Sequence, residues 1–160
     1  MSIVQHFRSM VAYETWANRA SLASIETVPP AARSGVVFPR ALQVMAHNQL
    51  ARRAWLARLQ GRVEVIADWF PTWSAAEIAT AAAELDAAWT DYLAGLSEAD
   101  LAREISYKAS DGTAYTSTVH EVLTHVANHS TYHRGQVARL VSEAGGRRAV
   151  TDYIAMTRRS

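Results

Sequence analysis

Apolar residues recur three and four positions apart along most of the chain, which is the spacing of one face of an α-helix. The first such segment runs from about Ser2 to Thr27, and the two prolines that follow it, Pro29 and Pro30, forbid its continuation. Ser2 and Gln5 have the spacing of a capping box, in which each side chain binds the backbone of the other residue. This stretch therefore predicts a long amphipathic helix.

Three more helices are predicted farther along the chain. The second spans about residues 39–60, with Pro39 in the first turn, where a missing N–H costs little. The third spans about residues 75–96 and is rich in alanine, and the fourth runs from about residue 118 to the glycine pair at 145–146. Capping boxes are predicted at the start of the last two helices, formed by Ser74 with Glu77 and by Thr118 with Glu121.

The segment at 101–116 departs from the helical pattern. Residues 105–108 alternate in polarity, Asp111 and Gly112 form a turn pair, and residues 114–116 fit a returning strand, so a small hairpin and an irregular excursion are both compatible with it. The tail at 151–157 is expected to add a turn of helix packed across the others. Together the pattern predicts an all-α four-helix bundle, folded as a single domain over residues 1–160.

Composition excludes several kinds of protein. Of the 160 residues, 49% are hydrophobic and 19% are charged, which is the balance of a soluble globular chain. A net charge of +1 gives no general attraction to nucleic acid, so the arginine pairs at 52–53, 147–148 and 158–159 are interpreted as solvated surface. No apolar run reaches the roughly 18 residues of a membrane-spanning helix, and the N-terminus has no secretory signal. We therefore expect a cytoplasmic protein without nucleic-acid or membrane partners.

Cysteine is absent, and six histidines are present. A chain without cysteine forms no disulfide, no Cys-type zinc finger and no iron–sulfur cluster, and it has no cysteine nucleophile. Any transition metal must be held by imidazole and carboxylate groups. The histidines are therefore the residues in which to look for chemistry.

Four histidines lie on the fourth predicted helix, and two pairs of them are able to share an ion. His125 with His129, and His129 with His133, are four residues apart and lie on one face, with Cβ atoms about 6 Å apart. All three cannot bind one ion, since His125 and His133 are about 12 Å apart along the axis while metal–nitrogen bonds are about 2.1 Å. Val126 and Val137 lie at helical spacings from these histidines, which predicts that the stripe faces the bundle interior. A single inward histidine is more often a core residue with satisfied hydrogen bonds, but the repeat favours a metal site.

A metal site inside a bundle needs a ligand from a second helix, and His47 is the candidate. Val44 and Ala51 lie at helical spacings from His47, which predicts that this histidine also faces inward. The alternative is a lone core histidine bonded to a backbone carbonyl. Spacing alone leaves open whether the partner of His47 is the pair 125 and 129 or the pair 129 and 133.

The remaining histidines are interpreted as surface residues. His120, Glu121 and His125 do not form a zinc-protease motif, because an interval of five residues puts the two imidazoles about 140° apart around a helix. The Glu-x-x-His motif of di-iron bundles is also absent, since the residue three after Glu121 is Thr124. His120 and His6 are expected at helix edges, in contact with solvent.

Several other residues carry weaker expectations. The loop aromatics Trp69, Phe70 and Trp73 are predicted either to border a site or to cover the end of the bundle. Gln136 lies three residues after the last histidine and is a candidate to orient it through a hydrogen bond. Gly135 costs about 1 kcal/mol relative to alanine inside a helix, which predicts a close approach by a neighbouring backbone.

Four segments, in order along the chain, resemble motifs of the DinB-like (DinB/YfiT-type) family. The most specific is Asn-His-Ser-Thr-Tyr-His-Arg-Gly-Gln at 128–136, which resembles the family's N-H-x-x-x-H-R-G-Q motif. The segment at 13–18 is similar to the Y-N-x-W-A-N opening, with Glu14 in place of the usual asparagine. Met-Ala-His at 45–47 resembles the family's second-helix histidine motif, and Thr-Asp-Tyr-Ile at 151–154 resembles its closing T-D-[FLY]-I.

The resemblance implies a four-helix bundle of up-down-down-up topology with a long connection before the last helix. It also implies a divalent metal ion held by His47, His129 and His133, which selects one of the two pairs that spacing left open. His125 then belongs to the cavity wall or to an outer layer around the site. The family resemblance further implies a homodimer.

An open three-histidine site predicts a metal-dependent enzyme acting on a small molecule. The family resemblance implies that this enzyme is a thiol-dependent S-transferase or a hydrolase. Zinc or nickel is the expected ion, and because the chain has no cysteine, any attacking thiol must be a low-molecular-weight co-substrate. The alternative is a stress-related protein that binds a metal or a small molecule without catalysis. It stays open because no carboxylate is predicted beside the metal: Glu14 is expected at a surface edge.

Overall fold

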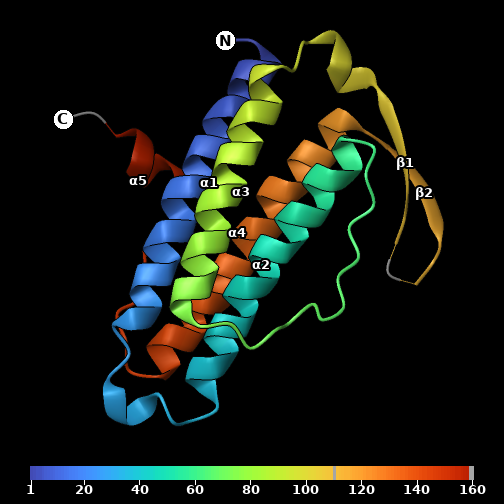
Figure 1. Cartoon of the computed structure of the whole chain (residues 1–160). Helices are drawn as coiled ribbons and strands as arrows, with labels where there is room; N and C mark the ends of the chain where they lie inside the picture. The colour runs from blue at the N-terminus through green and yellow to red at the C-terminus, as the bar shows by residue number, and fades with distance from the viewer. Residues whose placement is uncertain (110, 159–160) are drawn as a thin grey trace.

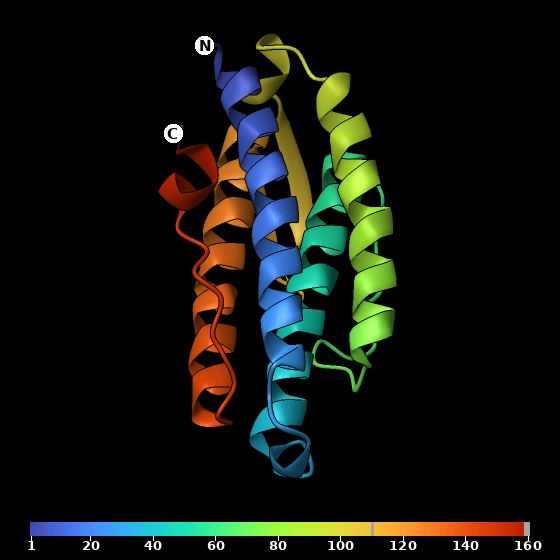
Figure 2. The same ribbon diagram turned by 90° about the vertical axis from the view of Figure 1, so that its left-hand side faces the viewer.

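Four long helices lie side by side in the computed structural model, which describes residues 1–109 and 111–158 (Figure 1). They are α1 (Ile3–Glu26), α2 (Val37–Leu59), α3 (Ala75–Ala94) and α4 (Val119–Glu143). Helices α1 and α4 run in one direction, and α2 and α3 run in the other (Figures 1 and 2). The four predicted helices are therefore present, with ends that differ from the predicted ones by at most three residues. Of the arginine pair at 158–159, the second residue lies outside the described part of the chain.

Five shorter elements complete the described structure. They are the 3₁₀ turns η1 (Pro30–Ala32) and η2 (Ala99–Ala102), the strands β1 (Glu104–Lys108) and β2 (Ala114–Thr118), and the helix α5 (Tyr153–Thr157). The two strands pair antiparallel, with Tyr107 opposite Tyr115, so the hairpin interpretation of this segment is confirmed and the irregular one is wrong. The turn of helix expected in the tail is α5.

The helix starts show how local sequence fixes the element boundaries. Both predicted capping boxes, at the starts of α3 and α4, are complete. At the start of α1 the predicted box is only half formed: Ser2 Oγ accepts a hydrogen bond from the backbone N of Gln5, at 3.2 Å. The carboxylate that binds this turn comes instead from Glu98, whose Oε1 accepts from the backbone N of Val4 at 2.9 Å. A residue far away in sequence thus takes the role predicted for a local one.

The buried apolar residues form two clusters, one toward each end of the helices. The first joins the start of α1 and α4 to the end of α2 and α3 and includes Phe7, Leu56, Trp89 and Ile105. The second lies at the opposite end and includes Ile25, Met45, Ile78 and Val141. Between them lies a layer of buried polar side chains from all four long helices: Glu14, Asn18, Asn48, Gln49, Arg52, Asp86, Ser130, His133 and Arg134. The predicted inward stripe of α4 is confirmed, because Val122, Val126, Val137 and Leu140 are all buried.

Two connections run along the outside of the helices. Residues 60–74 lead from the end of α2 to the start of the parallel helix α3 (Figure 1). After α4 the chain turns back and runs along α4 and α1 to α5 (Figure 2). Tyr13 fixes this C-terminal segment, donating a hydrogen bond from its hydroxyl to the backbone O of Thr151 at 2.6 Å. None of the helices in the described part of the chain combines the length and hydrophobicity that crossing a membrane requires.

Candidate metal centre

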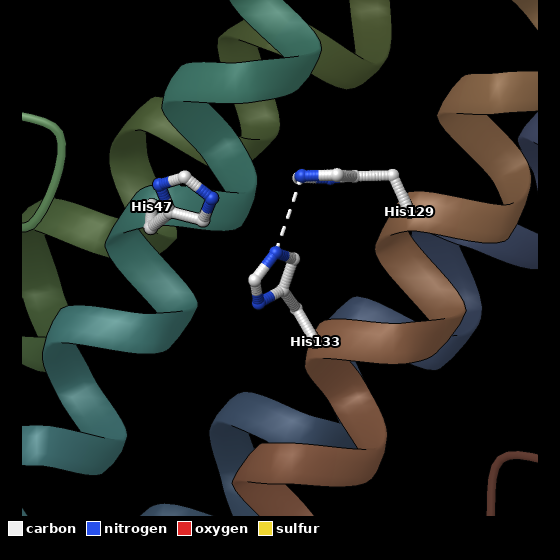
Figure 3. Close-up of side chains that lie close together, drawn as sticks. All are labelled: His47, His129 and His133. Atoms are coloured by element: carbon white, nitrogen blue, oxygen red, sulfur yellow. Dashed lines mark hydrogen bonds between the residues drawn. The ribbon is translucent and has the colours of Figure 1, made fainter.

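Three imidazoles meet between α2 and α4, near the middle of both helices (Figure 3). His47 comes from α2, while His129 and His133 lie one turn apart on α4. One ring nitrogen of each residue lies within 4.8 Å of those of the other two. The Nε2 atoms of His129 and His133 are 3.2 Å apart. The structure thus brings together the three histidines that the family resemblance selects.

Hydrogen bonds on the far side of two rings fix their orientation. His47 Nδ1 lies 3.0 Å from the backbone O of Trp69, and since a carbonyl only accepts, Nδ1 carries the proton. His133 Nδ1 lies 3.1 Å from the side-chain Oε1 of Gln136, which is the contact predicted for that glutamine. With Nδ1 protonated, Nε2 of each ring presents a lone pair to the cluster. Metal-binding histidines in proteins almost always have such an outer partner.

The environment keeps these imidazoles neutral. Burial, followed by the nearby His133, His125 and His47, lowers the pKa of His129 to about 4. Burial is also the main reason that the pKa values of His47 and His133 are lowered, and the charge of Arg40 lowers both further. All three rings are therefore uncharged at neutral pH, which is the state in which imidazole binds a metal.

The geometry of the cluster fits a single divalent ion. Two nitrogens bound at about 2.1 Å in tetrahedral geometry lie about 3.4 Å apart, close to the 3.2 Å between His129 Nε2 and His133 Nε2. Two lone pairs facing each other at that distance repel unless a cation or a proton lies between them. In the part of the chain that the structure describes, this is the one group of three histidine or carboxylate side chains so arranged.

A cavity of 520 Å³ opens beside His47 and His129, and its walls are mainly aromatic. Phe70 stacks on His47, with ring centroids 4.3 Å apart and an angle of 7° between the planes. Trp69 also lines the cavity, so two of the three loop aromatics border the site. Trp73 instead packs against the apolar cluster around Met45, and the alternative interpretation, that it covers the end of the bundle, holds for this residue.

The other three histidines lie outside the cluster. His125 is exposed, and its ring centroid lies 5.0 Å from that of Trp55 and 5.4 Å from that of His129, at the edge of the cavity wall. His120 is exposed and contacts the ring of Phe7. His6 is exposed on α1. The predicted surface positions of His6 and His120 are confirmed, and the exposed His125 lies beside His129 and not on the buried stripe of α4.

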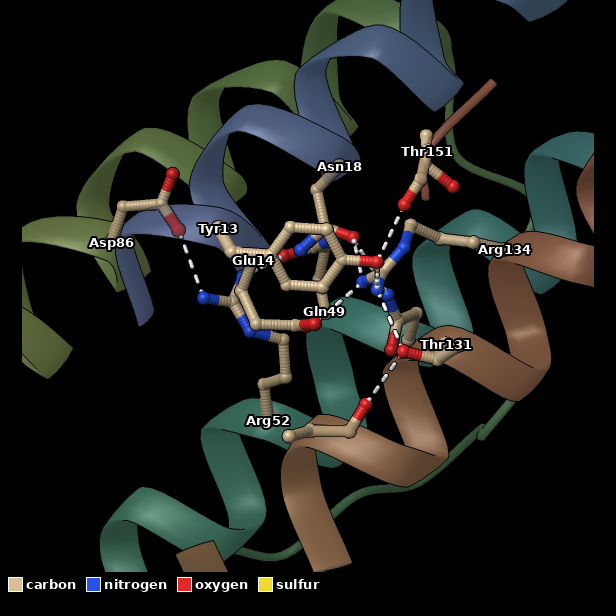
Figure 4. Close-up of polar contacts among 11 residues, drawn as sticks. Tyr13, Glu14, Asn18, Gln49, Arg52, Asp86, Thr131, Arg134 and Thr151 are labelled. Carbon is tan, nitrogen blue, oxygen red and sulfur yellow. Dashed lines mark hydrogen bonds and ion pairs between the residues drawn. The ribbon is translucent and has the colours of Figure 1, made fainter. Parts of the chain in front are cut away.

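Glu14 lies inside the molecule, so its predicted surface position is wrong. Only 2% of Glu14 is exposed, and its Oε1 lies 2.7 Å from Nη1 of Arg134, which is also 2% exposed (Figure 4). Nη2 of Arg134 donates hydrogen bonds to the hydroxyls of Tyr13, at 3.1 Å, and Thr131, at 2.9 Å. The sequence contained a signal: Arg134 lies at helical spacing from Val126 and Val137 on the buried stripe, and a buried arginine requires a counter-charge.

A second buried pair extends the polar layer to the other two helices. Nη2 of Arg52 lies 2.9 Å from Oδ1 of Asp86, and Nη1 donates to Oε1 of Gln49 at 2.9 Å (Figure 4). Asn48 on α2 donates to Asn18 on α1 at 3.1 Å. The prediction that Arg52 is solvated surface is wrong, because only 1% of this residue is exposed and it pairs with the buried Asp86. Arg134 and Asp86 were missed as candidates, because surface pairing is the usual role of such residues. Their bonds join α1, α2, α3 and α4 at the level of the histidines.

Gly135 does not have the role predicted for it. A Cβ atom at this position meets no atom within 4 Å, so no neighbouring backbone approaches it. A close approach occurs instead at Gly146, where a side chain would not fit. A Cβ atom there would lie 2.9 Å from methyl groups of both Val141 and Val28.

The fold and the site define a class: a helical protein with an open three-histidine cluster beside an aromatic cavity. The chain belongs to the DinB family, whose model matches residues 1–159. It is similar to protein DinB of Bacillus subtilis (strain 168), with 27% identity over 153 residues, covering 88% of this chain and 87% of that protein. Its fold is similar to the crystal structure of a DinB-like protein from Bacillus cereus ATCC 10987, with a TM-score of 0.68 and 20% identity over 91% of this chain and 95% of the other.

Proposed function

We propose that this chain is a metal-dependent enzyme that acts on a small molecule, as a thiol-dependent S-transferase or a hydrolase. The observation that carries the proposal is the cluster of three imidazoles, from two helices, at the wall of a cavity of 520 Å³. His47, His129 and His133 are the proposed ligands of one divalent ion, with zinc or nickel expected. Three neutral ligands leave the ion its full charge and an open position, as in catalytic zinc-type sites.

The residues around the cluster support this role. A bound divalent ion would lower the pKa of a water molecule bound to it to about 7. A thiol bound to the same ion would lose its proton outright. The backbone O of Trp69 and the side chain of Gln136 hold the His47 and His133 rings with Nε2 toward the ion. Phe70 covers one face of His47 and reduces its contact with solvent.

The choice between thiol transfer and hydrolysis depends on a proton acceptor. Hydrolysis is helped by a general base near the attacking water. The described residues that line the cavity include no carboxylate, and Glu14, the one acidic residue considered for this role, is bound to Arg134. A thiol needs less help, because a metal ion deprotonates it directly. Since the chain has no cysteine, that thiol would enter as a small molecule, which favours the S-transferase.

The alternative is a stress-related protein that binds a metal or a small molecule without catalysis. The described residues of the cavity wall include no carboxylate to act as a general base, and this supports a binding protein without catalysis. In this case the aromatic cavity would hold a ligand, and the ion would fix its orientation without transforming it.

Turnover separates these two functions. Wild-type protein loaded with zinc or nickel to several fractional occupancies is incubated with a panel of small electrophiles, with and without low-molecular-weight thiols. For the enzyme we expect a rate proportional to metal occupancy that falls to background in His129→Ala. Tight ligand binding without turnover, at full occupancy and with every thiol, would support the binding protein instead. In the cobalt- or nickel-substituted protein, the thiol co-substrate should shift the visible spectrum.

We also propose that residues 1–160 form one domain, a four-helix bundle of up-down-down-up topology. The opposed directions of the helix pairs α1/α4 and α2/α3, and the buried polar layer that joins all four, support this topology (Figure 1). A cytoplasmic homodimer without nucleic-acid or membrane partners stays a prediction. The net charge of +1 supports the absence of a nucleic-acid partner.

A further inference from the structure

Arg58 lies at the far end of the cavity from the histidine cluster. It follows His47 by eleven residues on α2, which is about three helical turns, so the two side chains share one face of that helix. Arg58 is half-buried and lines the same cavity as His47 and His129. Its guanidinium carbon lies 4.4 Å from the ring centroid of Trp55 and 5.1 Å from that of Tyr107.

Arg58 differs from the paired arginines in having no counter-charge. Arg52, Arg53, Arg134 and Arg139 each form an ion pair with an Asp or Glu side chain. Within residues 1–109 and 111–158, Arg58 forms no ion pair, and its one hydrogen bond to protein is from Nη2 to the backbone O of Lys108, at 3.1 Å. A guanidinium has five N–H donors in a planar fork that matches a carboxylate. Most of these donors are therefore available to a ligand.

The charges around the cavity are positive. Arg58 lines the cavity, and Arg40 lies over the ring of Phe70, 4.7 Å from its centroid, on the histidine side. No aspartate or glutamate is among the described residues of the cavity lining. A divalent ion on the histidines would add to this positive potential. An anionic ligand is therefore favoured over a neutral or a cationic one.

The walls between Arg58 and the histidines are apolar and aromatic. Trp55 and Tyr107 meet edge to face, with centroids 4.9 Å apart, and Tyr115 lies opposite Tyr107 in the hairpin. Trp69 and Phe70 continue the wall to His47. Such walls bury the apolar body of a ligand, while a few polar groups fix its orientation.

We propose that Arg58 binds the carboxylate of an elongated small-molecule acid, whose apolar body lies along the aromatic wall and whose other end reaches the histidine cluster. The acid would be the substrate class of the enzyme proposed above. This inference rests on the proposed function, because it treats the cavity as the substrate-binding site. Arg58 itself is a specificity-determining residue. The Trp55 and Tyr107 rings hold its guanidinium in place before the ligand arrives, which reduces the entropy lost on binding.

The test compares an acid with a neutral molecule of similar shape. The probes are 4-phenylbutyrate and 4-phenyl-1-butanol, titrated into the full chain while the tryptophan indole N–H signals are followed by NMR. Each titration is made with a chelator present and again with zinc bound. The variants are Arg58→Gln, which removes the charge, and Arg58→Lys, which keeps the charge but lacks the planar guanidinium that can donate two parallel hydrogen bonds. Arg19→Gln, an exposed arginine on α1, is the matched control.

We expect the acid to bind wild type and Arg19→Gln about 10- to 100-fold more tightly than the alcohol, also in the chelated protein. This preference should vanish in Arg58→Gln and survive in part in Arg58→Lys. Equal affinities in wild type, no binding of the acid at millimolar concentration, or a preference that survives in Arg58→Gln would overturn the proposal.

The two metal states keep this result separate from the proposed enzyme. The preference for the acid over the alcohol could appear only with zinc and survive in Arg58→Gln. That result would show that the ion binds the carboxylate, so it would overturn the role of Arg58 and support the metal site. A preference in chelated protein that depends on Arg58 supports the anion site even if no electrophile is turned over.

Discussion

Glu14 and Arg134 are both almost completely removed from solvent, and they lie on different helices. Transfer of either charge from water to the interior is unfavourable, and the mutual attraction of the pair offsets that loss. Hydrogen bonds from Arg134 to Tyr13 and Thr131 satisfy further donors, and Tyr13 in turn binds the backbone of Thr151. One buried arginine thus joins α1, α4 and the C-terminal segment next to His133.

Removal of that arginine alone should be strongly destabilising. In Arg134→Met the carboxylate of Glu14 stays buried without a partner, so we expect the free energy of unfolding to fall by about 3–5 kcal/mol, measured by urea denaturation. Glu14→Gln combined with Arg134→Met should recover part of this loss. The control is Arg139→Met, which removes an exposed pair with Glu143 and should cost about 1 kcal/mol or less. Equal losses in the two single variants would contradict this account of the buried pair.

The neutral histidines make the metal-free protein sensitive to acid. A histidine whose pKa is lower in the folded than in the unfolded protein binds fewer protons when folded, so the unfolded state gains protons first as the pH falls. For His129 this interval extends from the ordinary value of 6.5 to about 4. The contribution of neutral His129 to the free energy of unfolding is fully present above pH 6.5, and it is lost progressively as the pH falls from 6.5 to about 4.

We therefore expect the stability of the chelated protein to fall as the pH is lowered from about 7 to 4, and to fall less steeply in His129→Leu. Urea denaturation at several pH values measures the difference between the two proteins, which removes the contribution of the carboxylates common to both. His6→Leu, at an exposed position, is the control. A difference between wild type and His129→Leu that does not change with pH would be inconsistent with the lowered pKa.

At the level of the element, the C-terminal turn of α4 depends on one glycine. Gly146 follows the helix, and a Cβ atom there would lie 2.9 Å from Val141 and from Val28, both of which are fully buried. Gly135, inside the helix, has open space around it. The same substitution should therefore have opposite effects at the two positions.

Gly146→Ala is expected to lower the free energy of unfolding by about 1–3 kcal/mol, because two packed methyl groups must move. Gly135→Ala is expected to raise it by up to about 1 kcal/mol, since alanine favours helix and meets nothing there. Thermal and urea denaturation of both variants measure these effects. A Gly146→Ala variant as stable as wild type would show that Val141 and Val28 do not pack closely enough on this glycine to exclude a methyl group.

The elements themselves were largely predictable because their determinants are local. Helical periodicity, the complete capping boxes at Ser74 and Thr118, and the turn pair at 111–112 each involve residues close in sequence. The half-formed box at Ser2 shows the limit, since the carboxylate that binds there belongs to Glu98, which is 94 residues from Val4 in sequence. The loop that carries Phe70 has no periodicity, so nothing local indicated that this ring would stack on His47. The alternation that predicted β1 did not indicate that Tyr107 would meet Trp55 on α2.

At the scale of the whole molecule, a polar layer separates two apolar clusters, and the histidines lie at its level. The histidine pairs on α4 were predictable from their spacing, but the choice of His129 with His133 came from the family resemblance. Glu14 was misplaced because its burial depends on a partner 120 residues away in sequence. Contacts of that kind arise only when the helices pack, and periodicity within one helix does not reveal them.

The central claim is that His47, His129 and His133 hold one divalent ion, and metal content tests it most directly. Wild type, His129→Ala and the matched control His125→Ala, one turn away on the same helix, are exposed to zinc or nickel, desalted and analysed by mass spectrometry of the elements. We predict about one ion per chain in wild type and in His125→Ala, and almost none in His129→Ala. A wild-type protein that retains neither metal, or a stoichiometric ion retained by His129→Ala, would contradict the claim.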